Sequence, residues 1–276
     1  MTSLSVREAA VAGTFYPGDP AALRDTVDAL LEAAPRPPAG APVPRAIIVP
    51  HAGYVYSGPT AAVAYARIAA GRETIKRVVL VGPTHRVPVL GVALPGAETF
   101  RTPLGEVVVA EAWAEARLAD VGATRVFAET HRWEHSIEVQ LPFLQRVLGD
   151  FEIVPLLAGD ASGRDVADVL DALWGGPETL IVISSDLSHY LGYDEATQVD
   201  AATIAQISAL DGPLNHSQAC GATPINGLLV LAQRHGLVPT LLDARNSGDT
   251  AGDHNRVVGY CAFAFDEGSG ARDADA

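Results

Sequence analysis

Cysteine is scarce in this chain, since its 276 residues include only Cys220 and Cys261. Secreted domains that depend on disulfides contain more cysteines, and no basic region followed by an apolar core, as in a secretory signal, opens the sequence. No apolar run approaches the roughly 20 residues that a membrane span needs. We therefore expect a cytoplasmic protein with no membrane contact, in which a cysteine stays available as a thiolate ligand or nucleophile.

Basic residues are also few compared with acidic ones. Lysine and arginine number 19 against 33 aspartates and glutamates, which gives a formal net charge of −14. No local cluster of basic residues offsets this charge, and such a surface repels phosphate backbones, so we expect no nucleic-acid partner. The hydrophobic fraction of 48% with 19% charged residues excludes a disordered chain and indicates a sizeable core.

Short apolar runs alternate with segments of helical periodicity along most of the chain. This alternation favours a single three-layer α/β/α domain with a largely parallel central sheet. We expect that domain to span residues 1–268 and to be followed by a disordered acidic tail at 269–276. The expected strands are 45–49, 76–81, 151–157, 179–183, 239–242 and 257–265, and the expected helices are 20–34, 59–70, 111–120, 134–148, 164–173, 194–210 and 223–236.

Polar side chains follow three of these strands at the point where each strand ends. His51 follows the run at 45–49, His85 follows the run at 76–81, and Ser184, Ser185, Asp186 and His189 follow the run at 179–183. Ligands of open α/β sheets bind outside the carboxyl ends of the strands. The repetition therefore predicts a functional site at this edge of the sheet.

His51, His85 and Cys220 are the metal ligands that these residues suggest. Imidazole and thiolate suit iron, copper or zinc. Cys220 lies just ahead of an expected helix, whose N-terminal dipole would favour the thiolate. Taken singly, each residue has a simpler interpretation: a histidine after a strand is often a satisfied structural residue, and a lone cysteine is usually a small buried hydrophobe.

Four further residues are candidates for proton transfer or for orienting the ligands: His135, Glu138, Asp186 and His189. Ligating histidines usually donate their other N–H to a carboxylate, and catalytic metal sites keep a proton donor nearby. The simpler alternatives are a turn or helix cap for Asp186 and a solvated helix face for Glu138.

Other motifs in the sequence carry less weight. His131 to His135 spells H-x-x-E-H, the order of inverted zincin proteases, but that motif needs an uninterrupted helix, and Trp133 and Pro142 interrupt this one. The acidic loop at 247–255 does not have EF-hand spacing and is more typical of a solvated turn. No dinucleotide-binding or P-loop glycine pattern and no G-x-S-x-G elbow is present.

Taken together, several motifs resemble those of the Memo family, whose microbial members are known as the B component of the AmmeMemoRadiSam system. The resemblance follows the order of the chain over nearly its whole length. The motifs are AGTFYP, IIVPHAGYVYSG, VLVGPTHRVP, TPLGEV, EHSIEVQLPFL, VISSDLSHY, CGATPINGLL and SGD with a closing VVGY.

The resemblance implies a fold similar to that of class III extradiol dioxygenases, which are non-haem iron enzymes. It implies that His51 and His85 are metal ligands and that Cys220 completes the set. The softness of a thiolate ligand favours iron or copper as the metal. It places His135, Asp186 and His189 in the family's pocket, and it suggests radical-SAM and AMMECR-like partners. Some members carry Arg-His where this chain has Ala222 and Thr223, so a ligand contact made there would be lost.

Three hypotheses follow from the residues and the resemblance together. The first is an iron- or copper-binding redox protein with a dioxygenase-like pocket for a small molecule. The second is an extradiol-type dioxygenase or oxidase acting on a small aromatic substrate. The third is a non-enzymatic interaction module that retains the pocket.

Overall fold

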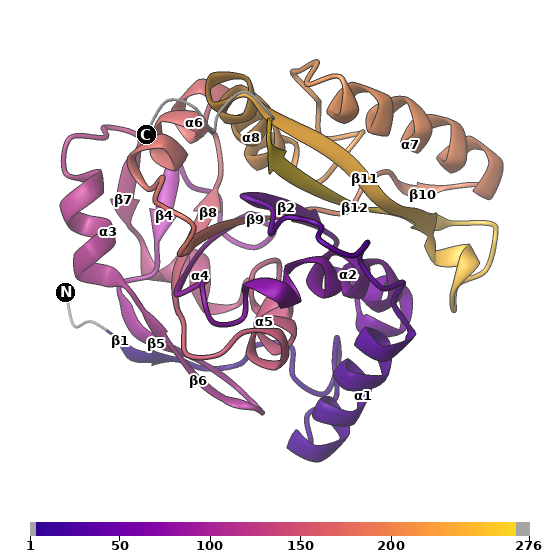
Figure 1. Cartoon of the computed structure of the whole chain (residues 1–276), viewed down its shortest axis with the longest axis horizontal. Coiled ribbons are helices and arrows are strands. Elements are labelled where there is room, and N and C mark those ends of the chain that lie inside the picture. Colours follow the sequence, from indigo (N-terminus) through magenta and orange to yellow (C-terminus); the bar gives the residue numbers. More distant parts are fainter. Residues whose placement is uncertain (1–3, 269–276) are drawn as a thin grey trace.

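The computed structural model describes residues 4–268. Within them, twelve strands form one sheet, in which nine strands follow the order β1-β5-β6-β8-β3-β9-β2-β12-β10 and β4, β7 and β11 pair alongside (Figure 1). The predicted acidic tail at 269–276 lies outside the described residues. The strands are β1 (Leu4–Arg7), β2 (Ala46–Val49), β3 (Arg77–Pro83), β4 (Val92–Leu94), β5 (Ala97–Thr102), β6 (Gly105–Val109), β7 (Thr124–Val126), β8 (Glu152–Ala158), β9 (Thr179–Ser184), β10 (His189–Leu191), β11 (Leu237–Asn246) and β12 (Val257–Glu267).

Helices cover both faces of this sheet. They are α1 (Pro20–Ala33), α2 (Tyr54–Ile68), α3 (Glu111–Leu118), α4 (Ala128–Arg132), α5 (Leu141–Val147), α6 (Gly163–Ala172), α7 (Tyr193–Ser208) and α8 (Ala222–His235), with 3₁₀ turns at Ala69–Gly71, Glu138–Gln140 and Ser247–Asp249. Asp19 caps α1 through the N–H of Ala22, and a Ser162–Asp165 capping box begins α6.

Strand β3 shows why the fold has three layers. Its side chains alternate between faces, and both faces are buried. Val78 and Leu80 join the core under α1, α2 and α5, whereas Val79 and Val81 join the core under α3, α6 and α8. The predicted three-layer α/β architecture is confirmed, and Figure 1 shows α1 and α5 on the side of the sheet opposite α6 and α8.

The middle of the sheet is parallel, and both flanks contain antiparallel pairs; on the side of β8, β5 pairs antiparallel with β6 and β4 with β8. β8, β3, β9 and β2 pair in parallel, as expected, and β12 then pairs antiparallel with both β2 and β11. β11 and β12 are joined by residues 247–256, which contain only one 3₁₀ turn, and such a short return favours antiparallel pairing. β11 pairs with almost all of β12 and spans Leu237–Asn246, so it is longer than the predicted strand at 239–242.

The segment 134–148 differs from its prediction as one helix. Residues 134–137 have no helical structure, Glu138–Gln140 is a 3₁₀ turn, and α5 begins only at Leu141. Pro142 lacks an N–H and is therefore accommodated in the first turn of α5 rather than in a helix interior. Consequently Glu134 and His135 lie on an irregular stretch of backbone.

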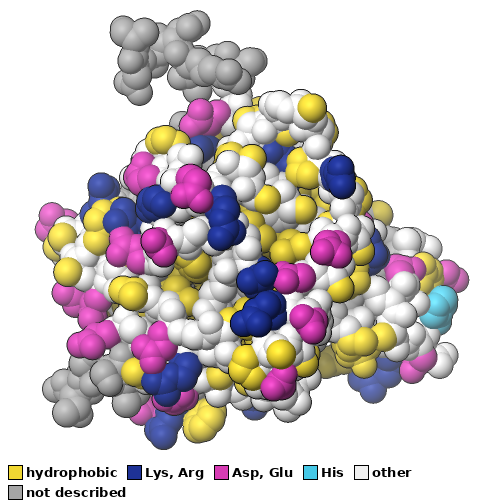
Figure 2. All heavy atoms as spheres, turned by 60° about the horizontal axis from the view of Figure 1, so that its bottom comes forward, with side chains coloured by type: hydrophobic (Ala, Val, Ile, Leu, Met, Phe, Trp, Pro, Cys, Tyr) yellow, Lys and Arg dark blue, Asp and Glu magenta, His cyan; other side chains and the backbone are white. Residues whose placement is uncertain are grey.

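On the face of the molecule shown in Figure 2, the Lys and Arg side chains lie in small separate groups among acidic ones. None of the helices in residues 4–268 combines the length and the apolar character that crossing a membrane requires.

Candidate metal centre

The site forms where three neighbouring strands end at the same edge of the sheet. His51 follows β2 after Pro50, His85 follows β3 after Thr84, and Asp186 lies two residues beyond β9. In the sheet, β9 lies between β2 and β3, so residues far apart in the chain become neighbours. The ring centroids of His51 and His85 are 5.2 Å apart, which confirms that these two strand ends meet.

His135 is the third imidazole of this cluster. Its ring centroid lies 5.5 Å from that of His51 and 4.7 Å from that of His85. One ring nitrogen from each of the three residues lies within 4.8 Å of the other two. Two nitrogens bound to one ion at about 2.1 Å each are at most about 4.2 Å apart, so the cluster comes close to what a metal ion requires.

The hydrogen bonds of Ser184 determine which nitrogen of His51 is free. The Ser184 hydroxyl donates to the carbonyl oxygen of Ser136 at 2.5 Å and accepts from Nε2 of Gln140 at 2.8 Å. The hydroxyl oxygen also lies 3.0 Å from Nδ1 of His51. Because its one hydrogen is already donated, it accepts a hydrogen bond from Nδ1–H here. The lone pair of His51 is on Nε2.

His51 is neutral without a metal because it is buried. Burial, followed by the nearby charges of His85 and His135, holds its pKa well below the usual value. Burial likewise lowers the pKa of His135 to about 4. Neutral imidazoles bind metals without first losing a proton.

Glu134 orients His85 and was not among the residues singled out from the sequence. Its carboxylate accepts from the backbone N–H of His85 at 2.6 Å and from Nδ1 of His85 at 2.9 Å. It also accepts from the backbone N–H groups of His135 and Ser136, each at 2.9 Å. Nε2 of His85 is thereby left free, and the carboxylate–imidazole pair is typical of metal sites.

The protein holds Glu134 ionised although it is buried. Burial alone raises the pKa of this carboxyl, but the hydrogen bonds and charge of His85, helped by the Ser136 N–H, outweigh it and hold the pKa at about 2. In the sequence, Glu134 appears as the glutamate of the rejected H-x-x-E-H motif and as the first residue of EHSIEVQLPFL, with no indication that it contacts His85.

Cys220 lies just before α8, with its Sγ 3.2 Å from Nε2 of His51. The backbone N–H of Asp186 donates to the same sulfur at 3.3 Å. The sulfur lies outside the group of three mutually close imidazole nitrogens that the described residues form. Burial, then the charge of Asp186, raises the pKa of the thiol to about 12, so the expected lowering by the helix N-terminus does not prevail.

Asp186 and His189 border the same site. Asp186 is buried and accepts from the backbone N–H of His51 at 2.7 Å. Burial raises its pKa to about 6, although the hydrogen bond from His51 opposes the shift. Nδ1 of His189 lies 2.8 Å from the carbonyl oxygen of Leu187 and therefore carries the proton, which leaves Nε2 free.

A cavity of about 770 Å³ opens over these residues. His51, His85, His135, Asp186 and His189 all line it. Aromatic rings and two arginines also line it: Phe15, Tyr56, Tyr190, Tyr260, Arg86 and Arg256. The ring centroids of Phe15 and His135 are 4.7 Å apart. The Arg256 guanidinium lies 4.9 Å from the centre of the Tyr190 ring.

Glu138 does not face this cavity. It is buried and accepts from the hydroxyl of Tyr16 at 2.6 Å and from the backbone N–H groups of Ala10 and Val11, and it forms an ion pair with Arg7. It therefore holds the N-terminal segment against the domain. The simpler alternative of a solvated helix face is also wrong for this residue.

His131 lies outside the cluster, whereas the acidic loop borders the cavity above it, which Ser247, Ala251, Gly252 and Asp253 line. Nε2 of His131 donates to the carbonyl oxygen of Ala93 at 3.0 Å, and α4 ends at Arg132 before reaching His135, so the zincin arrangement is not formed. In the loop, Asp249 and Asp253 accept from the backbone N–H groups of Asn246 and Asn255, as a tight turn requires.

Comparison with known proteins identifies the family. The model of the Memo-like protein family matches residues 7–264. The chain belongs to this family. A Memo family protein of Aquifex aeolicus is 36% identical over 277 residues, which cover 95% of this chain and 100% of that protein.

Two archaeal members of the Memo family are similar to the same extent. The protein of Methanosarcina acetivorans is 37% identical over 279 residues, covering 94% of this chain and 99% of the relative. That of Sulfolobus acidocaldarius is 35% identical over 285 residues, with 94% and 99% covered. The predicted family resemblance is confirmed, and the histidine cluster of this Memo protein can hold a metal ion.

Proposed function

We propose that this Memo protein binds a redox-active transition metal, iron or copper, and uses it on a small molecule held in the cavity above His51, His85 and His135. The observation that carries the proposal is the convergence of these three imidazoles within 4.8 Å. Zinc would also fit the donor set but supplies no redox chemistry.

His51, His85 and Cys220 are the proposed ligands. Nε2 of His51 is free because Ser184 accepts from Nδ1, and Nε2 of His85 is free because Glu134 accepts from Nδ1. The Cys220 sulfur already lies 3.2 Å from Nε2 of His51, near the separation of two ligands on one ion. His135 is next to them as a further nitrogen donor or as a proton-transfer group.

The metal, when bound, supplies one-electron chemistry, and a soft thiolate ligand suits Cu(I) and Fe(II). The protein contributes the orientation of the ligands and control of protons. His135, His189 and Asp186 line the cavity, and the pKa of Asp186, raised by burial to about 6, lies close to the range in which a carboxyl both accepts and donates protons.

An oxidase or extradiol-type dioxygenase acting on a small aromatic molecule is the second candidate. The aromatic walls of the cavity favour it, since Phe15, Tyr56 and Tyr190 offer faces against which a ring can stack. Oxygen uptake with a panel of catechols on the Fe(II)-loaded protein tests this candidate. No uptake above the metal-free control across the panel would contradict it.

Metal analysis after anaerobic purification tests the main proposal. We expect the wild-type chain to hold about one iron or copper ion and the His51→Ala, His85→Ala and Cys220→Ala variants to bind it at least tenfold more weakly. Cys261→Ala is the matched control for the cysteine, since Cys261 lies in the core of β12. His235→Ala, at the far end of α8, is the control for the histidines.

Unchanged metal affinity in Cys220→Ala, with loss in His135→Ala, would remove the thiolate from the ligand set in favour of the third imidazole. Unchanged affinity in both His51→Ala and His85→Ala would end the proposal.

The proposal includes a reducing cytoplasmic setting, which both free cysteines support. It also includes the radical-SAM and AMMECR-like partners that the family resemblance implies, and co-purification with each of these proteins tests them. A His51→Ala/His85→Ala double variant that binds such a partner normally would favour the non-enzymatic interaction module.

A further inference from the structure

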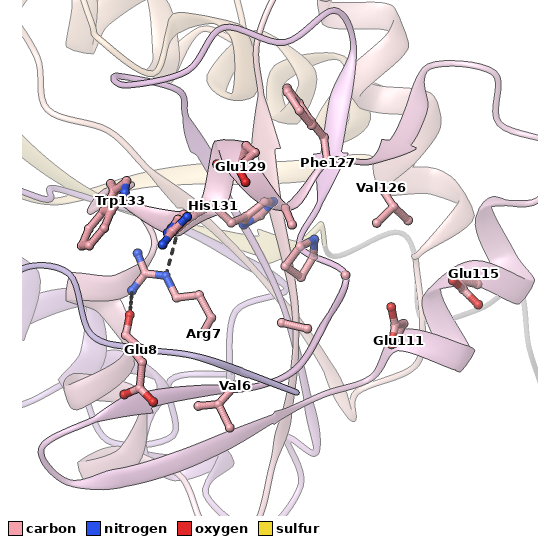
Figure 3. A pocket seen from close by; sticks show the side chains of 15 residues that line it. Val6, Arg7, Glu8, Glu111, Glu115, Val126, Phe127, Glu129, His131 and Trp133 are labelled. Carbon is pink, nitrogen blue, oxygen red and sulfur yellow. Dashed lines mark hydrogen bonds between the residues drawn. The ribbon is translucent and has the colours of Figure 1, made fainter. Parts of the chain in front are cut away.

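Figure 3 shows a second cavity, of about 760 Å³. It shares no lining residue with the cavity over the histidines. Four parts of the chain form it: the end of β1, the turn into β5, the outer side of α3, and the stretch through α4 to Trp133. The lining residues that matter here are Val126, Phe127, Trp133, His131 and three glutamates, Glu111, Glu115 and Glu129.

Apolar side chains form most of the walls. Trp133 is 58% exposed and Val126 is 48% exposed, and Phe127 lies next to Val126. Large apolar side chains that are left exposed around a concavity are typical of binding sites, and a volume of several hundred Å³ suits a small molecule.

The three glutamates have no cationic partner among residues 4–268. Glu111 and Glu115 are one turn apart on α3, and Figure 3 shows Glu129 on α4 at the other side of the cavity. Burial, then the charges of Glu115 and Glu98, raises the pKa of Glu111. A cation in the cavity would relieve this repulsion.

His131 adds a buried acceptor. The residue is 1% exposed, and because Nε2 donates to the carbonyl oxygen of Ala93, Nδ1 presents a lone pair. No hydrogen-bond partner for Nδ1 is present in the described part of the chain. Burial lowers the pKa of the ring to about 3, so the ring is neutral at neutral pH.

Two arginines, Arg7 and Arg132, also line the cavity. Arg7 donates to the carbonyl oxygens of His131 and Glu8, each at 3.0 Å, and to the carbonyl oxygen of Glu134 and the carboxylate of Glu138. Arg132 is exposed, and its guanidinium lies 5.5 Å from the centre of the Trp133 ring. Arg7 is neutralised by Glu138, so Glu111, Glu115 and Glu129 face one arginine, Arg132, and the lining keeps an excess of negative charge around an apolar interior.

We propose that this cavity binds a small arylalkylammonium ion, that is, an aromatic body carrying a protonated primary amine. The aromatic body packs between Val126, Phe127 and Trp133. The ammonium group brings a positive charge and N–H donors close to the three glutamates, which have no cationic partner in the described part of the chain. The proposal does not depend on the metal centre.

Calorimetric titration of the full chain with 2-phenylethylamine at neutral pH and low salt tests this site. We expect a Kd of about 0.1–1 mM. The neutral analogue 2-phenylethanol has the same body without the charge and should bind roughly tenfold more weakly or worse, and the anionic 3-phenylpropionate should not bind.

Two variants locate the site. In Glu111→Gln/Glu115→Gln/Glu129→Gln, the affinity for the amine should fall roughly tenfold or more, and the affinity for the alcohol should stay unchanged. Trp133→Ala should lower the affinity for both the amine and the alcohol. The matched control, Glu32→Gln/Glu73→Gln/Glu195→Gln, makes the same change in net charge at exposed positions elsewhere and should bind the amine as the wild type does.

Equal affinity of the wild type for the amine and the alcohol would overturn the proposal. So would a control triple variant that loses as much affinity for the amine as the cavity triple variant does. Binding of capped lysine peptides with no binding of the free amine would also overturn it, in favour of a protein partner. Absence of heat with the amine up to about ten times the expected Kd would exclude the site.

Discussion

The sulfur of Cys220 lies 3.2 Å from Nε2 of His51, although the two residues are 169 positions apart in the chain. Nε2 is the nitrogen of His51 that Ser184 leaves free. The thiol is protonated at neutral pH, because burial and then Asp186 raise its pKa to about 12. A metal that binds both residues must displace the proton on sulfur.

Metal binding should therefore release a proton that comes from Cys220. The metal-free thiol keeps its proton below a pKa of about 12, so affinity should rise about tenfold per pH unit as pH increases through neutrality. In unbuffered titration with Fe(II) or Zn(II), the wild type should release about one proton more than Cys220→Ala. Equal proton release by the two proteins would show that the sulfur does not bind.

Replacing Glu134 with glutamine should weaken metal binding by roughly 10–100-fold. The amide removes the charge that fixes Nδ1–H of His85, although it can retain some of the backbone hydrogen bonds. Competition with a chelator measures the change. An exposed control is Glu106→Gln, which pairs with Arg101; neither residue lines the cavity over the histidines. Affinity equal to that of the wild type would contradict the orienting role of Glu134.

Replacing Glu138 with glutamine should reduce stability and leave metal affinity nearly unchanged. Arg7 and Glu138 are both buried, and removing one charge leaves the other unpaired, at a cost of roughly 3–5 kcal/mol. Denaturant unfolding of the metal-free protein measures this loss. Glu106→Gln removes an exposed, solvent-screened ion pair and should leave stability nearly unchanged. A Glu138→Gln protein as stable as this control would contradict our account of the N-terminal segment.

Replacing Gly221 with alanine should displace Cys220. A Cβ at this position would lie 2.6 Å from Cβ of Ser185 and 2.9 Å from the carbonyl oxygen of Ser184. The start of α8 would have to move, and we expect at least about tenfold weaker metal binding. Gly122→Ala is the control, since a Cβ there meets nothing within 4 Å. If the two variants bind metal equally well, the position of the sulfur does not limit affinity.

The strands and the two strand-end histidines could be predicted because their signals are local. An apolar run of four to seven residues indicates a buried strand wherever it occurs, and the residue after it lies at the edge of a parallel sheet. His51 and His85 follow from that rule alone. The antiparallel flank of β11 and β12 could not be predicted, since strand order depends on which edges remain free after the helices have packed.

The surroundings of the ligands depend on contacts between distant segments. Glu134 reaches His85 only because residues 134–137 are irregular, which the helical spacing of Ile137, Leu141 and Leu144 concealed. The pKa of Cys220 was misjudged for a related reason. The helix N-terminus is visible in the sequence, whereas burial of the sulfur beside Asp186 appears only after folding.

X-ray absorption at the metal edge tests the central claim most directly. On anaerobically loaded protein, we predict one sulfur neighbour at about 2.3 Å with imidazole nitrogens at about 2.0–2.1 Å, and loss of the sulfur signal in Cys220→Ala but not in Cys261→Ala. A wild-type spectrum with only nitrogen and oxygen neighbours would contradict a metal centre built on His51, His85 and Cys220.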